Sequence, residues 1–131
     1  MKWFEKHYNI SLAITILIAI FIFYMSSRTF EMVISTTSGL QWKTTVYHFT
    51  IFFLLSTFIS TYLVRGKSSR KRLIIIGVIV SSIYAISDEI HQLFVPGRFC
   101  SITDVLIDFL GIILAGIIYL KLRTNPKSAF P

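Results

Sequence analysis

The chain of 131 residues is short of the residue patterns on which many soluble enzymes depend. It has a single cysteine, Cys100, so it can form no internal disulfide and no paired-cysteine metal motif. It also contains neither the glycine-flanked serine of a nucleophile elbow nor the glycine-rich pattern of a phosphate-binding loop. We interpret Cys100 as a small apolar filler in a loop. These absences argue against the common hydrolase and nucleotide-binding classes.

Acidic residues are scarce too, with 6 Asp and Glu against 13 Lys and Arg and a formal net charge of +7. In a soluble protein such an excess would suggest a nucleic-acid partner. Here the basic residues are divided among short loops, and they do not lie on an element of the kind that binds the grooves or bases of nucleic acids. We therefore expect no nucleic-acid partner. The excess has another source, because Lys and Arg concentrate in the cytoplasmic loops of membrane proteins.

Extended polar segments are rare, since 54% of the residues are hydrophobic. Four apolar runs approach or exceed the length of about 18 residues that crosses roughly 30 Å of hydrocarbon. The runs are continuous and do not alternate, which argues against a β-barrel. We predict an all-α polytopic membrane protein, a four-transmembrane-helix bundle that forms one domain over residues 1–131. The expected spans are residues 8–25, 44–64, 73–94 and 102–122.

The distribution of basic residues predicts the orientation of these spans. Four spans put both termini and the loop of residues 65–72 on one side of the membrane. The basic residues of that side are Lys2, Lys6, Arg65, Lys67, Arg70, Lys71, Arg72, Lys121, Arg123 and Lys127, whereas the other side has Arg28, Lys43 and Arg98. Because positive loops stay inside, we expect both termini to be cytoplasmic and residues 88–108 to lie at the outer surface.

Small and polar residues recur three or four positions apart in the spans, which places them on one face of each helix. On the second span they are His48, Ser56 and Ser60, on the third Gly77, Ser81, Ala85, Asp88 and Gln92, and on the fourth Asp104, Asp108, Gly111 and Ala115. Helices in lipid associate through such residues. We therefore expect these faces to meet and to gather a polar cluster at the outer mouth of the bundle.

The candidate functional residues are the ionisable and amide side chains of this mouth. An ionisable group inside a span is a functional candidate by default. The set comprises His48, Asp88, Glu89, Gln92, Arg98, Asp104 and Asp108. Asp88 and Glu89 face different sides of their helix, so we expect one of them to point at the bundle and Gln92 to neighbour either. A solvated helix end is the alternative interpretation of these acids.

Two residues of the set have structural alternatives. Ser101 and Asp104 have the spacing of a capping box, with the serine as N-cap and the acid three positions later. Arg98 follows Pro96 and Gly97 in a segment with the pattern of a type II turn. Its planar fork could hold a ligand carboxylate or phosphate, or it could form a structural salt bridge to Glu89 or Asp104.

A metal site made of His48, Glu89, His91 and Asp104 is conceivable, but no short ligand spacing supports it. We therefore expect neither a metal nor another cofactor. Both histidines could instead be buried and satisfied by hydrogen bonds, which is the interpretation we favour for His91.

One motif carries a family resemblance. It resembles the signature of the VanZ-like membrane proteins and consists of Asp88, Glu89, Gln92, Arg98, Asp104, Val105, Leu106, Ile107 and Gly111, with Phe94, Pro96, Gly97 and Ser101 also fitting. His48-Phe49 is similar to the histidine that begins the family's second span. The chain departs from the pattern at Thr44-Thr45, where the family often has Asp-Lys, and at Asp108, where it more often has asparagine.

The resemblance implies a small protein of the bacterial cytoplasmic membrane that works in the cell envelope. The name-giving member of the family is linked to low-level resistance to the glycopeptide teicoplanin. This implies the lipid bilayer as one partner and a lipid-linked envelope precursor or a glycopeptide as another.

Three functions follow from these observations. The leading hypothesis is a protein whose outer mouth binds a polar group of a wall precursor, a lipid head group or a lipoglycopeptide. The second is a membrane enzyme in which Asp88, Glu89 and His48 perform acid–base work on a lipid-linked substrate. The third is a non-catalytic accessory subunit of an envelope enzyme or transporter, in which the acids and Arg98 only hold the bundle together.

Overall fold

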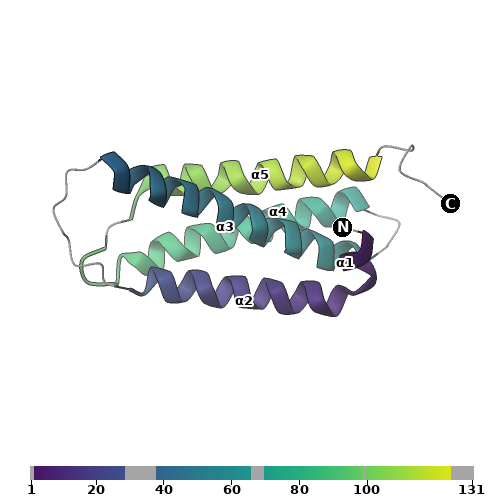
Figure 1. Ribbon diagram of the computed structural model, residues 1–131, viewed down its shortest axis with the longest axis horizontal. Coiled ribbons are helices and arrows are strands. Elements are labelled where there is room, and N and C mark those ends of the chain that lie inside the picture. Colours follow the sequence, from purple (N-terminus) through teal and green to yellow (C-terminus); the bar gives the residue numbers. More distant parts are fainter. Residues whose placement is uncertain (1, 29–37, 66–69, 99, 125–131) are drawn as a thin grey trace.

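Helices account for almost all of the chain that the computed structural model describes, which is residues 2–28, 38–65, 70–98 and 100–124 (Figure 1). No strand occurs in these ranges. The helices are α1 (Lys2–Lys6), α2 (Tyr8–Ser26), α3 (Ser38–Val64), α4 (Arg70–Gln92) and α5 (Ile102–Thr124). The four longer helices each contain a segment long and apolar enough to cross a membrane, which confirms the predicted polytopic four-helix bundle. The short helix α1 was not predicted.

The helix boundaries differ from the predicted spans mainly at α3 and α4. Helix α3 begins at Ser38, before the predicted 44, and its membrane-crossing segment begins at Trp42. Helix α4 ends at Gln92, two residues before the predicted 94, because turns follow it. The last of these turns has a 3.1 Å hydrogen bond from the Arg98 N–H to the Val95 carbonyl and a φ of 78° at Gly97. This positive φ confirms the predicted type II turn.

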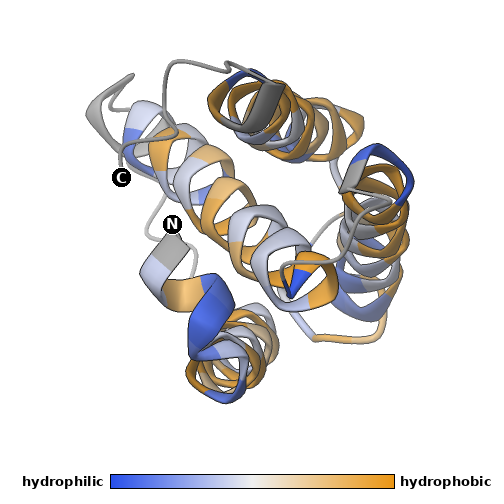
Figure 2. Cartoon of the chain, turned by 90° about the vertical axis from the view of Figure 1, so that its right-hand side faces the viewer, coloured by the Kyte–Doolittle hydropathy of each residue, from blue (hydrophilic) through white to orange (hydrophobic). Residues whose placement is uncertain are grey.

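Helix α3 occupies the centre of the bundle and contacts α2, α4 and α5. Its apolar core residues Phe52 and Leu55 pack with Ile22 of α2, Ala85 of α4 and Ile112 of α5. Each predicted small and polar face turns inward, with its residues buried or half-buried. Large apolar side chains remain exposed along the outer surfaces. Figure 2 shows hydrophobic residues, in orange, on all the long helices. Small and polar faces that turn inward, together with large apolar side chains that face outward, suit a bundle surrounded by lipid.

Small residues set how closely the helices approach. A Cβ atom on Gly111 of α5 would lie 2.5 Å from the Phe49 carbonyl oxygen of α3, so only glycine fits there. About two turns after Phe49, the Ser56 hydroxyl donates a 3.4 Å hydrogen bond to the carbonyl oxygen of Ile112, the residue after Gly111. The contact between α3 and α5 is therefore backbone to backbone, and it fixes the relative height of the side chains on these two helices.

The beginning and the end of the described chain lie at the same end of the bundle (Figure 1). There the buried hydroxyl of Tyr119 on α5 donates a hydrogen bond to the carboxylate of Glu5 on α1. The loop between α4 and α5 lies at the opposite end, next to most of the candidate residues.

Candidate functional site

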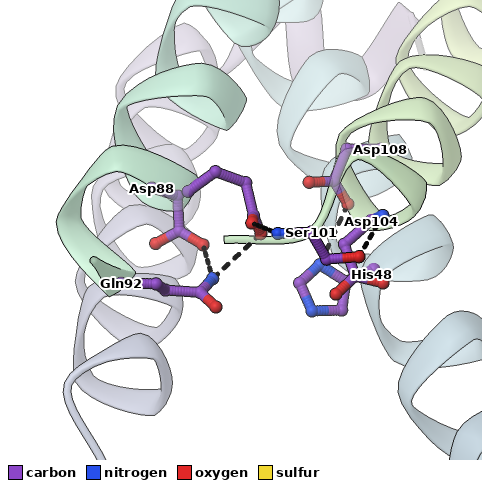
Figure 3. A network of polar contacts seen from close by, with 7 residues as sticks. His48, Asp88, Gln92, Ser101, Asp104 and Asp108 are labelled. Atoms are coloured by element: carbon purple, nitrogen blue, oxygen red, sulfur yellow. Dashed lines mark hydrogen bonds and ion pairs between the residues drawn. The ribbon is translucent and has the colours of Figure 1, made fainter. Parts of the chain in front are cut away.

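Six of the seven candidate residues come together at the end of the bundle that the α4–α5 loop covers (Figure 3). We call them the acidic cluster; its members are His48 of α3, Asp88, Glu89 and Gln92 of α4, and Asp104 and Asp108 of α5. All are buried except Asp104, which is half-buried. Three helices contribute to the cluster, and their backbone contacts hold these side chains in place.

On α4, both acids point into the bundle, where one was predicted to do so. The exposed fraction is 6% for Asp88 and 1% for Glu89. The side-chain N–H groups of Gln92 donate to both of them, over 3.1 Å to Asp88 Oδ2 and 3.0 Å to Glu89 Oε1. Both positions are covered because α4 packs against α2 as well as against α3 and α5. These contacts confirm the prediction that Gln92 lies close to each acid.

At the start of α5, the cap differs in one respect from a capping box. The Asp104 N–H donates a 3.3 Å hydrogen bond to Ser101 Oγ, so the predicted N-cap is confirmed. In a full capping box the acid would bond back to the Ser101 N–H. Here that N–H donates instead to Glu89 Oε2, over 2.9 Å. No described residue donates a hydrogen bond to the Asp104 carboxylate, which is therefore available for a ligand.

Between α3 and α5, His48 and Asp108 form a buried pair. Nδ1 of His48 lies 3.1 Å from Asp108 Oδ1, with exposed fractions of 5% for the histidine and 0% for the acid. An ionised carboxylate only accepts, so Nδ1 is the donor in this pair, and in the neutral imidazole Nε2 then has the lone pair. The second oxygen, Oδ2 of Asp108, is buried without a hydrogen-bond partner among the described residues.

A metal-binding geometry exists for three of the four residues considered from the sequence. One ligand atom each of His48, Glu89 and Asp104 lie within 4.8 Å of one another. The fourth residue, His91, points elsewhere: its ring stacks on Phe23 of α2 at 4.7 Å and its Nε2 lies 3.0 Å from the Ser27 hydroxyl. His91 is thus a half-buried histidine with a hydrogen-bond partner, close to the interpretation we favoured.

Arg98 lies beside the cluster and joins the loop to α2. Its guanidinium donates to the carbonyl oxygens of Met25 over 3.1 Å and of Ser26 over 3.4 Å. It does not form the salt bridge to Glu89 or Asp104 that we considered. The carbonyls at a helix C-terminus carry a partial negative charge, which attracts a cation.

Two contacts in the structure were not predicted from the sequence. The N–H of Ser101 was not expected to bind Glu89, and Glu5 was not expected to bind Tyr119. No local pattern could have shown either, because each joins residues whose proximity depends on tertiary packing. Cys100 is exposed beside the cluster. Partial desolvation, together with the neighbouring Glu89 carboxylate, raises the pKa of its thiol, so it is a weak nucleophile at neutral pH.

Comparison with known proteins agrees with this picture. Neither a curated protein nor a solved structure matches the chain. The family model described as VanZ/LLP1 matches residues 11–123, a range that contains the four long helices almost completely and the whole acidic cluster. A match over most of the chain, with four apolar helices and the motif gathered at one end, shows that the chain is a membrane protein of the VanZ/LLP1 family.

Proposed function

We propose that the chain binds a polar group of a wall precursor, a lipid head group or a lipoglycopeptide at the outer face of the bacterial cytoplasmic membrane. Binding there would contribute to glycopeptide resistance. The burial of Asp88, Glu89 and Asp108 beside His48 carries this proposal. Burying carboxylates costs free energy unless partners compensate for the lost hydration. A cluster retained at this cost inside membrane-crossing helices is more readily explained by a ligand than by folding.

The chemistry of the acidic cluster favours ligands that donate hydrogen bonds. It contains four carboxyl groups and one imidazole, and ionised carboxylates only accept. Hydroxyl and ammonium groups are the matching donors. Sugars and amino-acid side chains of wall precursors carry such groups, as do lipoglycopeptides. Among the polar groups of these molecules, we therefore favour hydroxyl and ammonium groups over phosphate or carboxylate.

The proposed orientation follows from the charges. The end with Glu5 and Tyr119 also carries Lys6 and Lys121, and the residues of the basic second loop lie at that end in the sequence-based topology. Basic residues stay cytoplasmic, so the acidic cluster would face outward. An outward cluster at the lipid–water interface can meet head groups and wall precursors without their crossing the hydrocarbon.

The proposal can be tested with an isosteric variant. The chain, Glu89→Gln and the control Ser87→Ala would be expressed at equal levels in a glycopeptide-susceptible bacterium. Ser87 lies next to the acidic cluster in sequence but is exposed and bonds to Ile83 within its own helix. We expect the chain and Ser87→Ala to raise the teicoplanin concentration needed for inhibition, and Glu89→Gln not to.

Binding would be measured in parallel with the purified proteins in nanodiscs, using labelled teicoplanin and a purified lipid-linked precursor. Equal inhibition and equal binding for the chain and Glu89→Gln would contradict the proposal. Loss of both with Ser87→Ala as well would point to a general loss of folding instead.

A second candidate function is favoured by the His48–Asp108 pair. A histidine oriented by a carboxylate can act as a general base. In that case the purified chain should convert a lipid-linked precursor, and His48→Gln should abolish turnover while binding persists. Binding of the precursor without any product would exclude this candidate for that substrate.

A further inference from the structure

We propose that the acidic cluster holds a divalent transition-metal ion, bound by a ring nitrogen of His48 and by one carboxylate oxygen each of Glu89 and Asp104. These three ligand atoms come from α3, α4 and α5 and lie within 4.8 Å of one another. Figure 3 shows the His48 ring and the Asp104 side chain next to each other at the end of the α4–α5 loop.

The spacing is close to what an ion requires. Nitrogen and oxygen ligands lie about 2.0–2.2 Å from Zn²⁺, so two ligands of a tetrahedral site are roughly 3.4 Å apart. Ligand atoms that all lie within 4.8 Å would need to move by an ångström or so to reach this separation. Rotation of the half-buried Asp104 side chain, whose carboxylate accepts no hydrogen bond from the described residues, supplies such a movement without a backbone change.

His48, Glu89 and Asp104 form the trio of ligands, and a contact with a residue outside this trio already orients His48. Nδ1 of His48 lies 3.1 Å from Asp108 Oδ1. When Nδ1 donates to the ionised carboxylate, Nε2 of the neutral imidazole has its lone pair for an ion. Metal-bound histidines usually make this bond to a carboxylate through their second nitrogen. Asp108 is fully buried, and its Oδ2 lacks a hydrogen-bond partner among the described residues. A buried acceptor without a donor is costly, and a cation nearby would lessen that cost.

Of the two carboxylates, Glu89 is oriented by hydrogen bonds, whereas Asp104 accepts none from the described residues. Glu89 receives one hydrogen bond on each oxygen, from Gln92 and from the Ser101 N–H. Since Glu89 occupies that N–H, Asp104 does not close the capping box, and its carboxylate remains available. Because the Ser101 N–H bonds to Glu89 and not to Asp104, the Asp104 carboxylate is available as the third ligand.

Charge supports a divalent ion. Neither Glu89 nor Asp104 forms an ion pair with a Lys or Arg of the described residues. Two carboxylates and a neutral imidazole together carry two negative charges, which a divalent cation cancels. A buried charge is tolerated when it is paired or coordinates a metal, so the ion would remove the cost of burying Glu89.

The donor set indicates the class of ion. One nitrogen and two oxygens, without a thiolate, suit Zn²⁺, Mn²⁺ or Fe²⁺, and affinity at such sites rises from Mn²⁺ towards Zn²⁺. We therefore expect Zn²⁺ to bind more tightly than Mn²⁺, and Mg²⁺ to bind weakly. Three protein ligands leave at least one position open, as in catalytic zinc sites.

The metal site itself does not depend on the proposed function. Only one extension rests on it, namely that the open position accepts a hydroxyl oxygen of the bound envelope molecule. The two ideas fail separately. Loss of metal binding in Glu89→Gln without any effect on glycopeptide binding would support the metal site alone. Loss of glycopeptide binding with unchanged metal binding would support the proposed function alone.

The test uses the purified full chain in detergent. After treatment with a chelator and its removal, Zn²⁺, Mn²⁺ and Mg²⁺ are titrated separately, and bound metal is measured by equilibrium dialysis with elemental analysis. We expect one Zn²⁺ per chain and a rise in Tm with Zn²⁺. His48→Gln, Glu89→Gln and Asp104→Asn should each weaken Zn²⁺ binding at least 100-fold. Asp108→Ala should weaken it about 10- to 100-fold, as expected for a contact that orients a ligand.

His91→Gln provides the matched control, because this histidine is half-buried on the α2 side and lies outside the trio. It should bind Zn²⁺ as tightly as the unmodified chain. Co²⁺ supplies an independent readout, since its visible absorption bands should appear in the chain and in His91→Gln but not in His48→Gln. Substoichiometric Zn²⁺ binding by the chain would overturn the proposal. Equal binding by folded Glu89→Gln would do the same.

Discussion

The backbone N–H of Ser101 donates a 2.9 Å hydrogen bond to Glu89 Oε2, and this bond joins the last turn of α4 to the residue that caps α5. Ser101 therefore has two roles, because its hydroxyl also accepts the Asp104 N–H. The buried acid is in this way part of the loop structure as well as of the acidic cluster. A substitution at Glu89 therefore affects both the loop and the acidic cluster.

The first prediction separates these roles. Glu89→Ala leaves the Ser101 N–H without its acceptor and the Gln92 amide with Asp88 alone. Glu89→Gln removes the charge but keeps one carbonyl oxygen as an acceptor. We expect Glu89→Ala to be less stable than Glu89→Gln by about 1–3 kcal/mol, the cost of unsatisfied buried polar groups. Reversible unfolding in mixed micelles measures the difference. Equal stabilities would show that the Ser101 bond contributes little to folding.

The second prediction concerns the contact between α3 and α5. In Gly111→Ala the new methyl group would lie 2.5 Å from the Phe49 carbonyl oxygen. This oxygen belongs to the backbone, so it cannot rotate away as a side-chain atom could. We expect a loss of stability of about 1–3 kcal/mol, as for other overpacked sites. Gly116→Ala is the control, because its methyl group meets only a side-chain atom of Val78, at 2.7 Å. If Gly116→Ala is as destabilising as Gly111→Ala, the backbone approach is not the limiting contact.

The third prediction concerns Arg98. Its bonds to the carbonyls of Met25 and Ser26 hold the α4–α5 loop against α2. Arg98→Ala should lower Tm and speed proteolysis within the loop, and Arg98→Lys should restore part of the loss because an ammonium group can still reach a carbonyl. Arg28→Ala, which removes an exposed cation over Tyr24, is the matched control. An unchanged proteolysis rate in Arg98→Ala would contradict this role.

The fourth prediction concerns the opposite end of the bundle. Tyr119 has an exposed fraction of 1%, and its hydroxyl donates to Glu5. Tyr119→Phe should cost about 1–3 kcal/mol, because the buried carboxylate loses a donor. A double-mutant cycle with Glu5→Ala, which removes the acceptor, measures the coupling between the two residues. Additive effects of the two substitutions would argue against a stabilising bond.

The fifth prediction tests orientation. Cys100 is the single cysteine and is exposed in the loop beside the acidic cluster. A membrane-impermeant maleimide should therefore label intact cells, and Cys100→Ser should abolish labelling. Because the thiol pKa is raised, less thiolate is present at neutral pH, and labelling should be faster at pH 8.5 than at pH 7. Labelling that occurs only after the cells are opened would place the loop in the cytoplasm.

Much of this fold could be predicted because its determinants are local. The inward faces of the helices follow from the spacing of residues such as Ser56, Ser81 and Ala115, which are all buried. The turn at Pro96-Gly97 and the cap at Ser101 are set by residues a few positions apart. Such patterns fix which side of a helix turns inward, and the structure confirms them.

Which residues form the site depends on contacts between helices, and no local sequence pattern contains these contacts. His48, Glu89 and Asp104 come from three helices, so the absence of a short ligand spacing could not exclude their meeting. The height of one helix against another is set by contacts such as that of Gly111 with Phe49. His91 was ambiguous for the same reason, because its direction depends on where α2 lies.

The contact between Glu5 and Tyr119 also bears on how the molecule could be rearranged. Since α1 and α5 meet there, a short peptide could join α5 to α1, and new ends could be opened between α3 and α4. An even number of crossings would leave both new ends on the same side of the bilayer as the old ones. Such a circular permutant should insert with unchanged topology, as is common for proteins whose ends lie close together.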